Sequence, residues 1–150
     1  MNTPTQAMTQ TEQELLQAMV DVIVREAEKM LKMAYKHYRA LTGMGNNEIF
    51  DEEVFGFHIQ QAVEKAFKAW LCALTGQYPF THDLTRLLIL LENVGIDMEK
   101  YWPLTQYNIF AVQARYEEGL LLPDEPLDRP GLTADLQALL EHVQQIIEKT

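Results

Sequence analysis

The chain has 150 residues, of which 47% are hydrophobic, and its formal net charge is −10 at pH 7. This length and composition predict one globular domain that buries roughly 70% of its unfolded surface, enough for a core that needs no covalent staples. The acidic balance excludes a general nucleic-acid binder, because contacts to many phosphates require a basic surface. It does not exclude a local basic site.

The single cysteine, Cys72, excludes an intrachain disulfide, and we interpret it as a small residue near the core. The first eight residues lack the basic start and apolar run of a signal peptide, and no apolar run approaches the roughly 20 residues of a membrane span. We therefore expect a cytoplasmic protein. We predict no cofactor and no metal, because the sequence has no HExxH, CxxC or glycine-rich phosphate loop.

Residues 1–10 are predicted to be a flexible N-terminus, and 11–150 a single helical domain. A first helix is expected over 11–41, opened by a capping box of Thr11 and Glu14. Its apolar positions follow steps of four and three, which is the pattern of a seam that packs against other helices. They are Leu16, Val20, Ile23, Ala27, Met30, Ala34, His37 and Leu41.

A second line on this helix is basic, also at steps of four and three. It consists of Arg25, Lys29, Lys32, Lys36 and Arg39. Two interpretations stay open. The stripe is either a phosphate-facing surface for a nucleotide, an RNA or a partner, or a solvated helix face whose lysines pair with acids one turn away.

The stretch 57–84 is a second helix, a tight connection and the start of a third helix. Apolar residues recur at helical spacing on one side, and a neighbouring polar stripe carries His58, Gln61, Lys65 and Lys68. Gly76 and Pro79 mark the connection. Thr81 is predicted to cap a helix that begins at His82, with Asp83 in its first turn.

The remaining sequence predicts three more helical segments and no strands. The third helix is expected over 82–94, a fourth over 104–117, a charged and proline-rich loop over 123–131, and a last helix from a cap at Thr133. The predicted fold is therefore all-α: an antiparallel up-and-down bundle of four long helices plus a C-terminal fifth.

The second and third helices resemble the HEPN family, named for its occurrence in higher eukaryotes and prokaryotes. The matching residues are Phe57, His58, Gln61, Ala62, Glu64, Lys65, Lys68, Thr81, His82, Asp83 and Leu84, and then Ala114, Arg115 and Tyr116. The resemblance implies an α-helical bundle. It implies one of three roles: small-nucleotide binder, partner of a minimal nucleotidyltransferase, or ribonuclease toxin.

A nucleotide-binding site is expected from seven residues. They are His58, Gln61, Lys65, His82, Asp83, Arg115 and Tyr116. Lys65 or Arg115 would supply a cation for phosphate, Gln61 a donor and acceptor for base or ribose, and Tyr116 an aromatic ring for stacking. The alternative is that these residues are scaffold, with hydrogen bonds between helices and a helix cap.

Catalytic branches of the family carry an arginine followed, after four to six residues, by a histidine, and none of the five arginines here has a histidine at that distance. The nearest imitation is Lys32 with His37, although His37 also fits a half-buried histidine with a backbone partner. We expect a non-catalytic accessory or nucleotide-binding module, a homodimer, beside a minimal nucleotidyltransferase. Two alternatives stay open: the degenerate ribonuclease toxin of a toxin–antitoxin pair, and a ligand-free interaction module.

Overall fold

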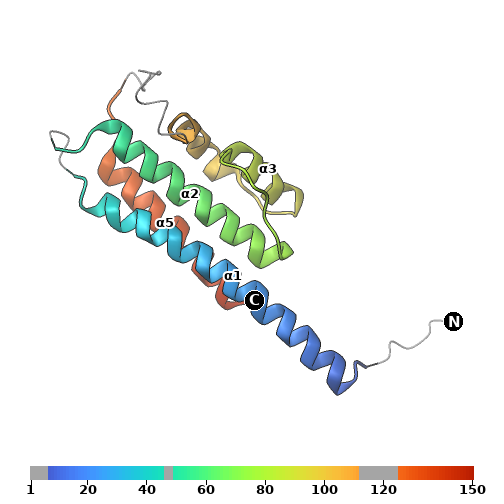
Figure 1. Ribbon diagram of the computed structural model, residues 1–150. Helices are drawn as coiled ribbons and strands as arrows, with labels where there is room; N and C mark the ends of the chain where they lie inside the picture. Colours follow the sequence, from blue (N-terminus) through green and yellow to red (C-terminus); the bar gives the residue numbers. More distant parts are fainter. Residues whose placement is uncertain (1–6, 46–48, 112–124) are drawn as a thin grey trace.

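The computed structural model describes residues 7–45, 49–111 and 125–150, and every regular element in them is a helix. Figure 1 shows the long helices lying side by side, with a shorter helical layer against one of them. The elements are α1 (Gln10–Thr42), α2 (Glu52–Thr75), α3 (Leu84–Asn93), the 3₁₀ helix η1 (Glu99–Phe110) and α5 (Arg129–Glu148).

Helix α2 lies at the centre of the fold, in contact with α1, α5, α3 and η1. It is apolar on nearly all sides, as a helix with neighbours all around must be. Its fully buried side chains include Phe55, Ile59, Phe67 and Trp70. Cys72 is buried near its end, and Gly76 closes it with a φ of 82°, a left-handed conformation that favours glycine.

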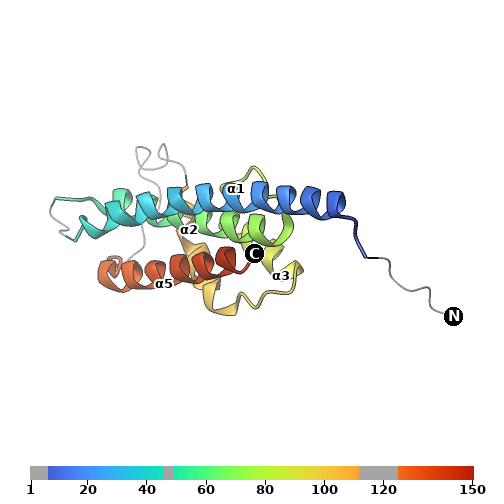
Figure 2. The same cartoon turned by 90° about the horizontal axis from the view of Figure 1, so that it is seen from below.

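Helix α1 is 33 residues long, about 50 Å, and extends past the end of α2 (Figure 2). It begins at Gln10, because Thr9, not Thr11, is the N-cap and accepts a hydrogen bond from the Glu12 amide at 3.1 Å. The predicted apolar seam is buried at Ala27, Met30, Ala34 and Leu41. Its first residue, Leu16, is 47% exposed.

Helix α5 begins four residues before its predicted cap. Asp128 is the N-cap and Pro130 lies in the first turn, where its missing N–H costs nothing. Arg129 is buried and donates to the carbonyl oxygens of Met44 (2.8 Å) and Phe50 (2.6 Å) and to Glu52 Oε1 (2.8 Å). This contact fixes the start of α5 to the α1–α2 connection.

The helical layer of α3 and η1 differs most from the sequence-based expectation. Helix α3 has only ten residues and is capped by Asp83, whose Oδ1 accepts from the Thr85 amide at 2.9 Å. Thr81 instead accepts from the Asp83 amide, one step before the helix. The expected fourth helix, 104–117, overlaps a 3₁₀ helix that runs through Pro103 to Phe110.

One close approach joins this layer to α2. Gly56 lies inside α2, and a Cβ built there would come within 2.7 Å of the Phe110 ring. Glycine is therefore required where the ring of η1 lies flat on the helix. This contact holds the end of η1 against the first turns of α2.

The all-α class is confirmed, whereas four long helices before a fifth are not what the described residues show. The helical elements pack around one hydrophobic cluster. Within the part of the chain that the structure describes, no helix has the length and apolar character needed to cross a membrane.

Candidate functional site

The carboxylate of Glu64, in the middle of α2, is the centre of a buried polar network. Its exposed fraction is 0%. Lys65 Nζ lies 2.8 Å and Lys68 Nζ 3.0 Å from its Oε2, and His82 Nδ1 lies 2.9 Å from its Oε1. The carboxylate is thus in contact with two side chains of its own helix and with one side chain of the α2–α3 connection.

The charges of this network do not cancel. Burial would raise the pKa of Glu64, but hydrogen bonds from Lys65 and His82, the Lys65 charge and a hydrogen bond from Lys68 lower it to about 2. Glu64 is therefore ionised at pH 7, with one negative charge against two lysine ammonium groups. The cluster keeps an excess of one positive charge at the surface reached by Lys65 and His82.

Two glutamines extend the network along α2. Gln60 is fully buried and donates through Nε2 to the His82 carbonyl oxygen (2.9 Å) and to Glu64 Oε1 (3.2 Å). Gln61 donates to Gln60 Oε1 at 2.6 Å and accepts from Lys65 Nζ at 3.3 Å. The side-chain amides thus hold the backbone at His82 and the ammonium of Lys65 in place.

A pair of histidines lies beside this network. The Nδ1 atoms of His37 on α1 and His58 on α2 are 2.9 Å apart, so one ring donates and the other accepts. Burial, followed by the nearby His58 and the Lys65 charge, lowers the pKa of His37 to about 4. Burial also lowers the pKa of His58. Both rings are therefore neutral at pH 7.

The structure brings together four of the seven predicted site residues. Gln61, Lys65 and His82 share the Glu64 network. His58 joins the histidine pair, in which the pKa of His37 responds to Lys65 and Glu64. Asp83 is not part of this group: it caps α3 and accepts from Asn108 Nδ2 of η1 at 3.0 Å. The predictions for Arg115 and Tyr116 lie outside the described residues.

Sequence reasoning missed the residues that organise the site. Gln60 had no assigned role, and Glu64 and Lys68 were not among the predicted site residues. All three repeat at steps of four along α2. That spacing places three polar groups on one buried line, which is a usable signal for a polar network. His37 was expected to have a backbone partner, and its partner is instead His58.

The basic stripe of α1 is exposed along its whole length. Among the described residues, none of its five cations lies within 4.0 Å of a carboxylate oxygen, so the predicted pairing with acids one turn away is not formed. In the same part of the chain, no group of three or more His, Cys, Asp or Glu side chains is placed to hold a metal ion.

Comparison with known proteins identifies the family. A family model described as the HEPN domain matches residues 20–150, which is most of the chain. No curated protein and no solved structure is similar enough to match. The family match includes the whole Glu64 network and both histidines of the pair, with all of α2 and the part of α1 from Val20 onward. The chain belongs to the HEPN domain family.

Proposed function

We propose that this chain is a nucleotide-binding accessory module whose phosphate-recognition site is the surface of the Glu64 network. The observation that carries the proposal is the uncompensated positive charge: one buried carboxylate holds two ammonium groups. A buried ion cluster with no ligand would be expected to balance its charges, because residual charge at a poorly solvated site is costly. An anion such as phosphate supplies the missing charge.

Lys65 and His82 are the groups available to that anion. Lys65 has three N–H donors and uses two, on Glu64 and Gln61, so one remains. The side chain of His82 is 65% exposed, and Glu64 holds its Nδ1, which leaves Nε2 free for a ligand. Gln61 retains one amide hydrogen and one lone pair, which suit a base or a ribose hydroxyl.

A thermal-shift titration with ATP, GTP, AMP and short RNA tests this proposal. A ligand of the native state raises the apparent stability by mass action. We expect a saturable rise that Lys65→Met and His82→Ala remove. Lys149→Met is the matched control, since it removes the same charge from the exposed end of α5 and should leave the rise intact. No change in the apparent stability at millimolar ligand would contradict the proposal. It would mean that the network has a structural role only and that the chain is an interaction module.

The histidine pair favours a second candidate function, RNA cleavage. Cleavage needs a general base near the 2′-hydroxyl and a cation at the phosphate. A neutral histidine of the His37–His58 pair could act as the base, Lys65 could supply the cation, and a carboxylate already orients His82. Lys32, the cation of the sequence-based version, is exposed and is not among the groups that shift the His37 pKa.

A labelled single-stranded RNA incubated with purified protein and EDTA decides between the two functions. Cleavage that His37→Ala and His82→Ala abolish would identify the ribonuclease of a toxin–antitoxin pair. Complete stability of the RNA, with intact nucleotide binding, would leave the accessory module. Lys32→Ala serves as the control, because the ribonuclease candidate built on Lys65 predicts no effect of that change.

We propose further that the chain pairs with a second copy through the free end of α1. Residues 10–22 contain no buried side chain, yet Leu15, Met19 and Val22 are each more than half exposed on one side. A helix of this length is marginal in water without a packing partner. On an adjacent flank of α1, the acidic residues Glu14 and Asp21 come before the basic stripe. In an antiparallel pair of α1 helices, the acidic part of each helix would therefore face the start of the basic stripe of the other.

Sedimentation velocity measures this association. Wild type should sediment as a dimer, and Met19→Glu should shift it to a monomer with unchanged helicity. Gln17→Glu, the same added charge outside the apolar flank, should leave the dimer. The proposed partner enzyme, a minimal nucleotidyltransferase, rests on family membership alone. Its test is whether a small nucleotidyltransferase encoded beside this chain co-purifies with it.

A further inference from the structure

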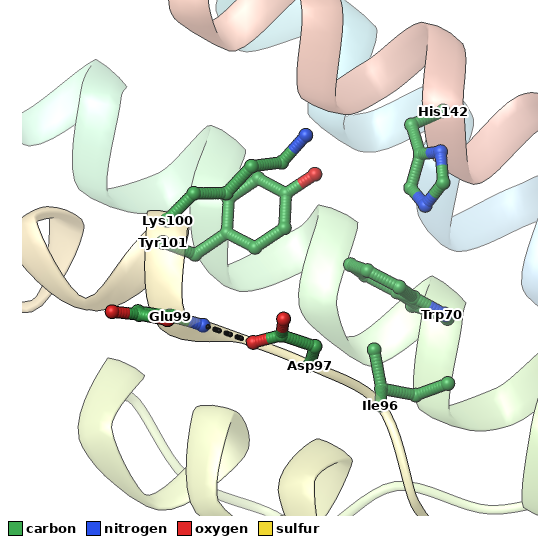
Figure 3. Close-up of a pocket in the computed structure, with 7 residues that line it drawn as sticks. All are labelled: Trp70, Ile96, Asp97, Glu99, Lys100, Tyr101 and His142. Atoms are coloured by element: carbon green, nitrogen blue, oxygen red, sulfur yellow. Dashed lines mark hydrogen bonds between the residues drawn. The ribbon is translucent and has the colours of Figure 1, made fainter.

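A cavity lies on another side of α2, away from the Glu64 network. It has a volume of about 600 Å³ and lies between α2, the segment leading into η1, and α5. Trp70 is six residues after Glu64, which places it about 240° around the helix axis. Figure 3 shows its lining, which is Trp70, Ile96, Asp97, Glu99, Lys100, Tyr101 and His142.

Three aromatic rings form a corner in this cavity. The Tyr101 ring stands at 90° to Trp70, with centroids 5.8 Å apart, and the His142 ring stands at 76° to Trp70, with centroids 5.0 Å apart. Tyr101 and His142 thus rise as two walls beside the indole (Figure 3). Rings arranged at right angles around one space are the geometry that binds quaternary ammonium groups.

The cavity already contacts an ammonium group. Lys100 Nζ lies 5.1 Å from the centroid of the Tyr101 ring, within the range of a cation–π interaction. Lys100 belongs to the same short segment as Tyr101 and is exposed, so its side chain can leave the ring. The lysine therefore shows where a cation is favourable, and it would compete with an incoming one.

The lining of the cavity also carries a counter-charge for a cation. It includes the carboxylates of Asp97 and Glu99 and the ammonium of Lys100. Asp97 accepts the Glu99 amide through Oδ1 at 3.0 Å, which leaves Oδ2 available. Burial, followed by the charges of Lys100 and Lys149, lowers the pKa of His142, so this ring is neutral at pH 7 and adds no repulsion.

Trp70 itself fits this role. It is 2% exposed, and its Nε1 is the one buried side-chain nitrogen or oxygen in the described residues without a hydrogen-bond partner. A buried indole usually finds a partner for its N–H. Here the residue lines the cavity, and its indole is the strongest cation–π partner among the side chains.

We propose that this aromatic corner binds a small organic cation of the alkylammonium class, independently of the nucleotide site. The ammonium would lie against the Trp70, Tyr101 and His142 rings with Asp97 as counter-charge, in the place that Lys100 now borders. The cavity is large enough for such a group and its substituent. Since no residue is shared with the Glu64 network, loss of one site leaves the other.

Choline and its neutral carbon isostere, 3,3-dimethylbutan-1-ol, test the proposal. The readout is tryptophan fluorescence in a Trp102→Phe background, where Trp70 is the only fluorescent indole. We expect a saturable change with choline, with a midpoint in about the millimolar range, and binding of the isostere weaker by about 5-fold or more. Sodium chloride at equal ionic strength is the blank.

Three variants of the cavity lining should change the affinity for choline, two of them downward and one upward. Asp97→Asn should weaken choline binding about 2- to 5-fold, and His142→Leu, which keeps the volume and removes the ring, should weaken it as well. Lys100→Met should strengthen it, because the competing ammonium is gone. Lys32→Ala, a change at an exposed position of α1, should have no effect. No saturable change, equal binding of the isostere, or weaker binding in Lys100→Met would overturn the proposal.

Discussion

Glu64 on α2 and His82 before α3 are joined by an imidazole–carboxylate contact of 2.9 Å between Nδ1 and Oε1. The contact joins a residue with no solvent exposure to one whose side chain is 65% exposed. It therefore links the buried Glu64 carboxylate to a side chain at the surface, where a ligand can reach His82. The stability and the proposed binding of this protein both depend on that connection.

Replacing Glu64 by glutamine should be among the most destabilising single changes in α2. The substitution leaves Lys68, which is 7% exposed, with no carboxylate, and breaking a buried ion pair costs about 3–5 kcal/mol. Urea denaturation measures the loss in the free energy of unfolding. Glu141→Gln, an exposed position on α5, should change that free energy by less than about 0.5 kcal/mol. Equal effects of the two changes would contradict the role of Glu64.

The stability of the protein should fall in two steps as the pH is lowered. The pKa of His37 is lowered from 6.5 to about 4, so the unfolded chain binds the proton first, and stability is lost between pH 6.5 and 4. The pKa of Glu64 is lowered from 4.5 to about 2, so a further loss of about 3 kcal/mol follows between pH 4.5 and 2.

Unfolding measured against pH separates these two steps. His37→Gln should flatten the limb between pH 6.5 and 4 and leave the steeper acid limb, whereas Glu64→Gln should remove most of the acid limb. Burial also lowers the pKa of His58 and His142, so part of the upper limb should remain in His37→Gln. Stability that rises on acidification through either range would contradict the assignment.

Gly56→Ala should destabilise the fold although alanine is the better helix former. The gain in helix propensity is about 1 kcal/mol, whereas forcing a Cβ against the Phe110 ring should cost about 1–3 kcal/mol. A double-mutant cycle with Phe110→Leu isolates the clash. The second substitution should recover part of the loss caused by the first, and strictly additive effects would show that Phe110 does not press on Gly56.

Arg129→Lys should destabilise the start of α5 nearly as much as Arg129→Met. Arg129 reaches two backbone carbonyl oxygens and Glu52 at once and lies 5.0 Å from the Phe55 ring centroid, a geometry that requires the guanidinium fork. The expected cost is about 2–4 kcal/mol in either variant, by thermal or chemical unfolding. Wild-type stability in Arg129→Lys would mean that only the positive charge of Arg129 is needed.

The sequence predicted the fold class and the importance of α2, because the apolar spacing of Ile59, Val63, Ala66 and Trp70 is a strong local signal. It misplaced the start of α5, because Asp128, Pro130 and Gly131 form a turn signal as well as a helix start. The 3₁₀ helix η1 was missed for a similar reason: Pro103 indicated a break, while the structure carries the proline inside the helix.

The sequence predicted those residues of the candidate site that lie on one face of α2. His58, Gln61 and Lys65 share a stripe by spacing alone, and the structure places all three at the site. The His37–His58 contact could not be read from the sequence, because it depends on the relative rotation of α1 and α2. The buried position of Glu64 was hidden too, since a glutamate followed by Lys65 and Lys68 resembles a solvated helix face.

The most direct test of the central claim is an isothermal titration of ATP into the purified protein, its Lys65→Met variant and its Lys149→Met control. We predict saturable binding to wild type and to Lys149→Met, and none to Lys65→Met at the same concentrations and with unchanged helicity. ATP binding that survives Lys65→Met undiminished would contradict the claim that the Glu64 network forms the phosphate site.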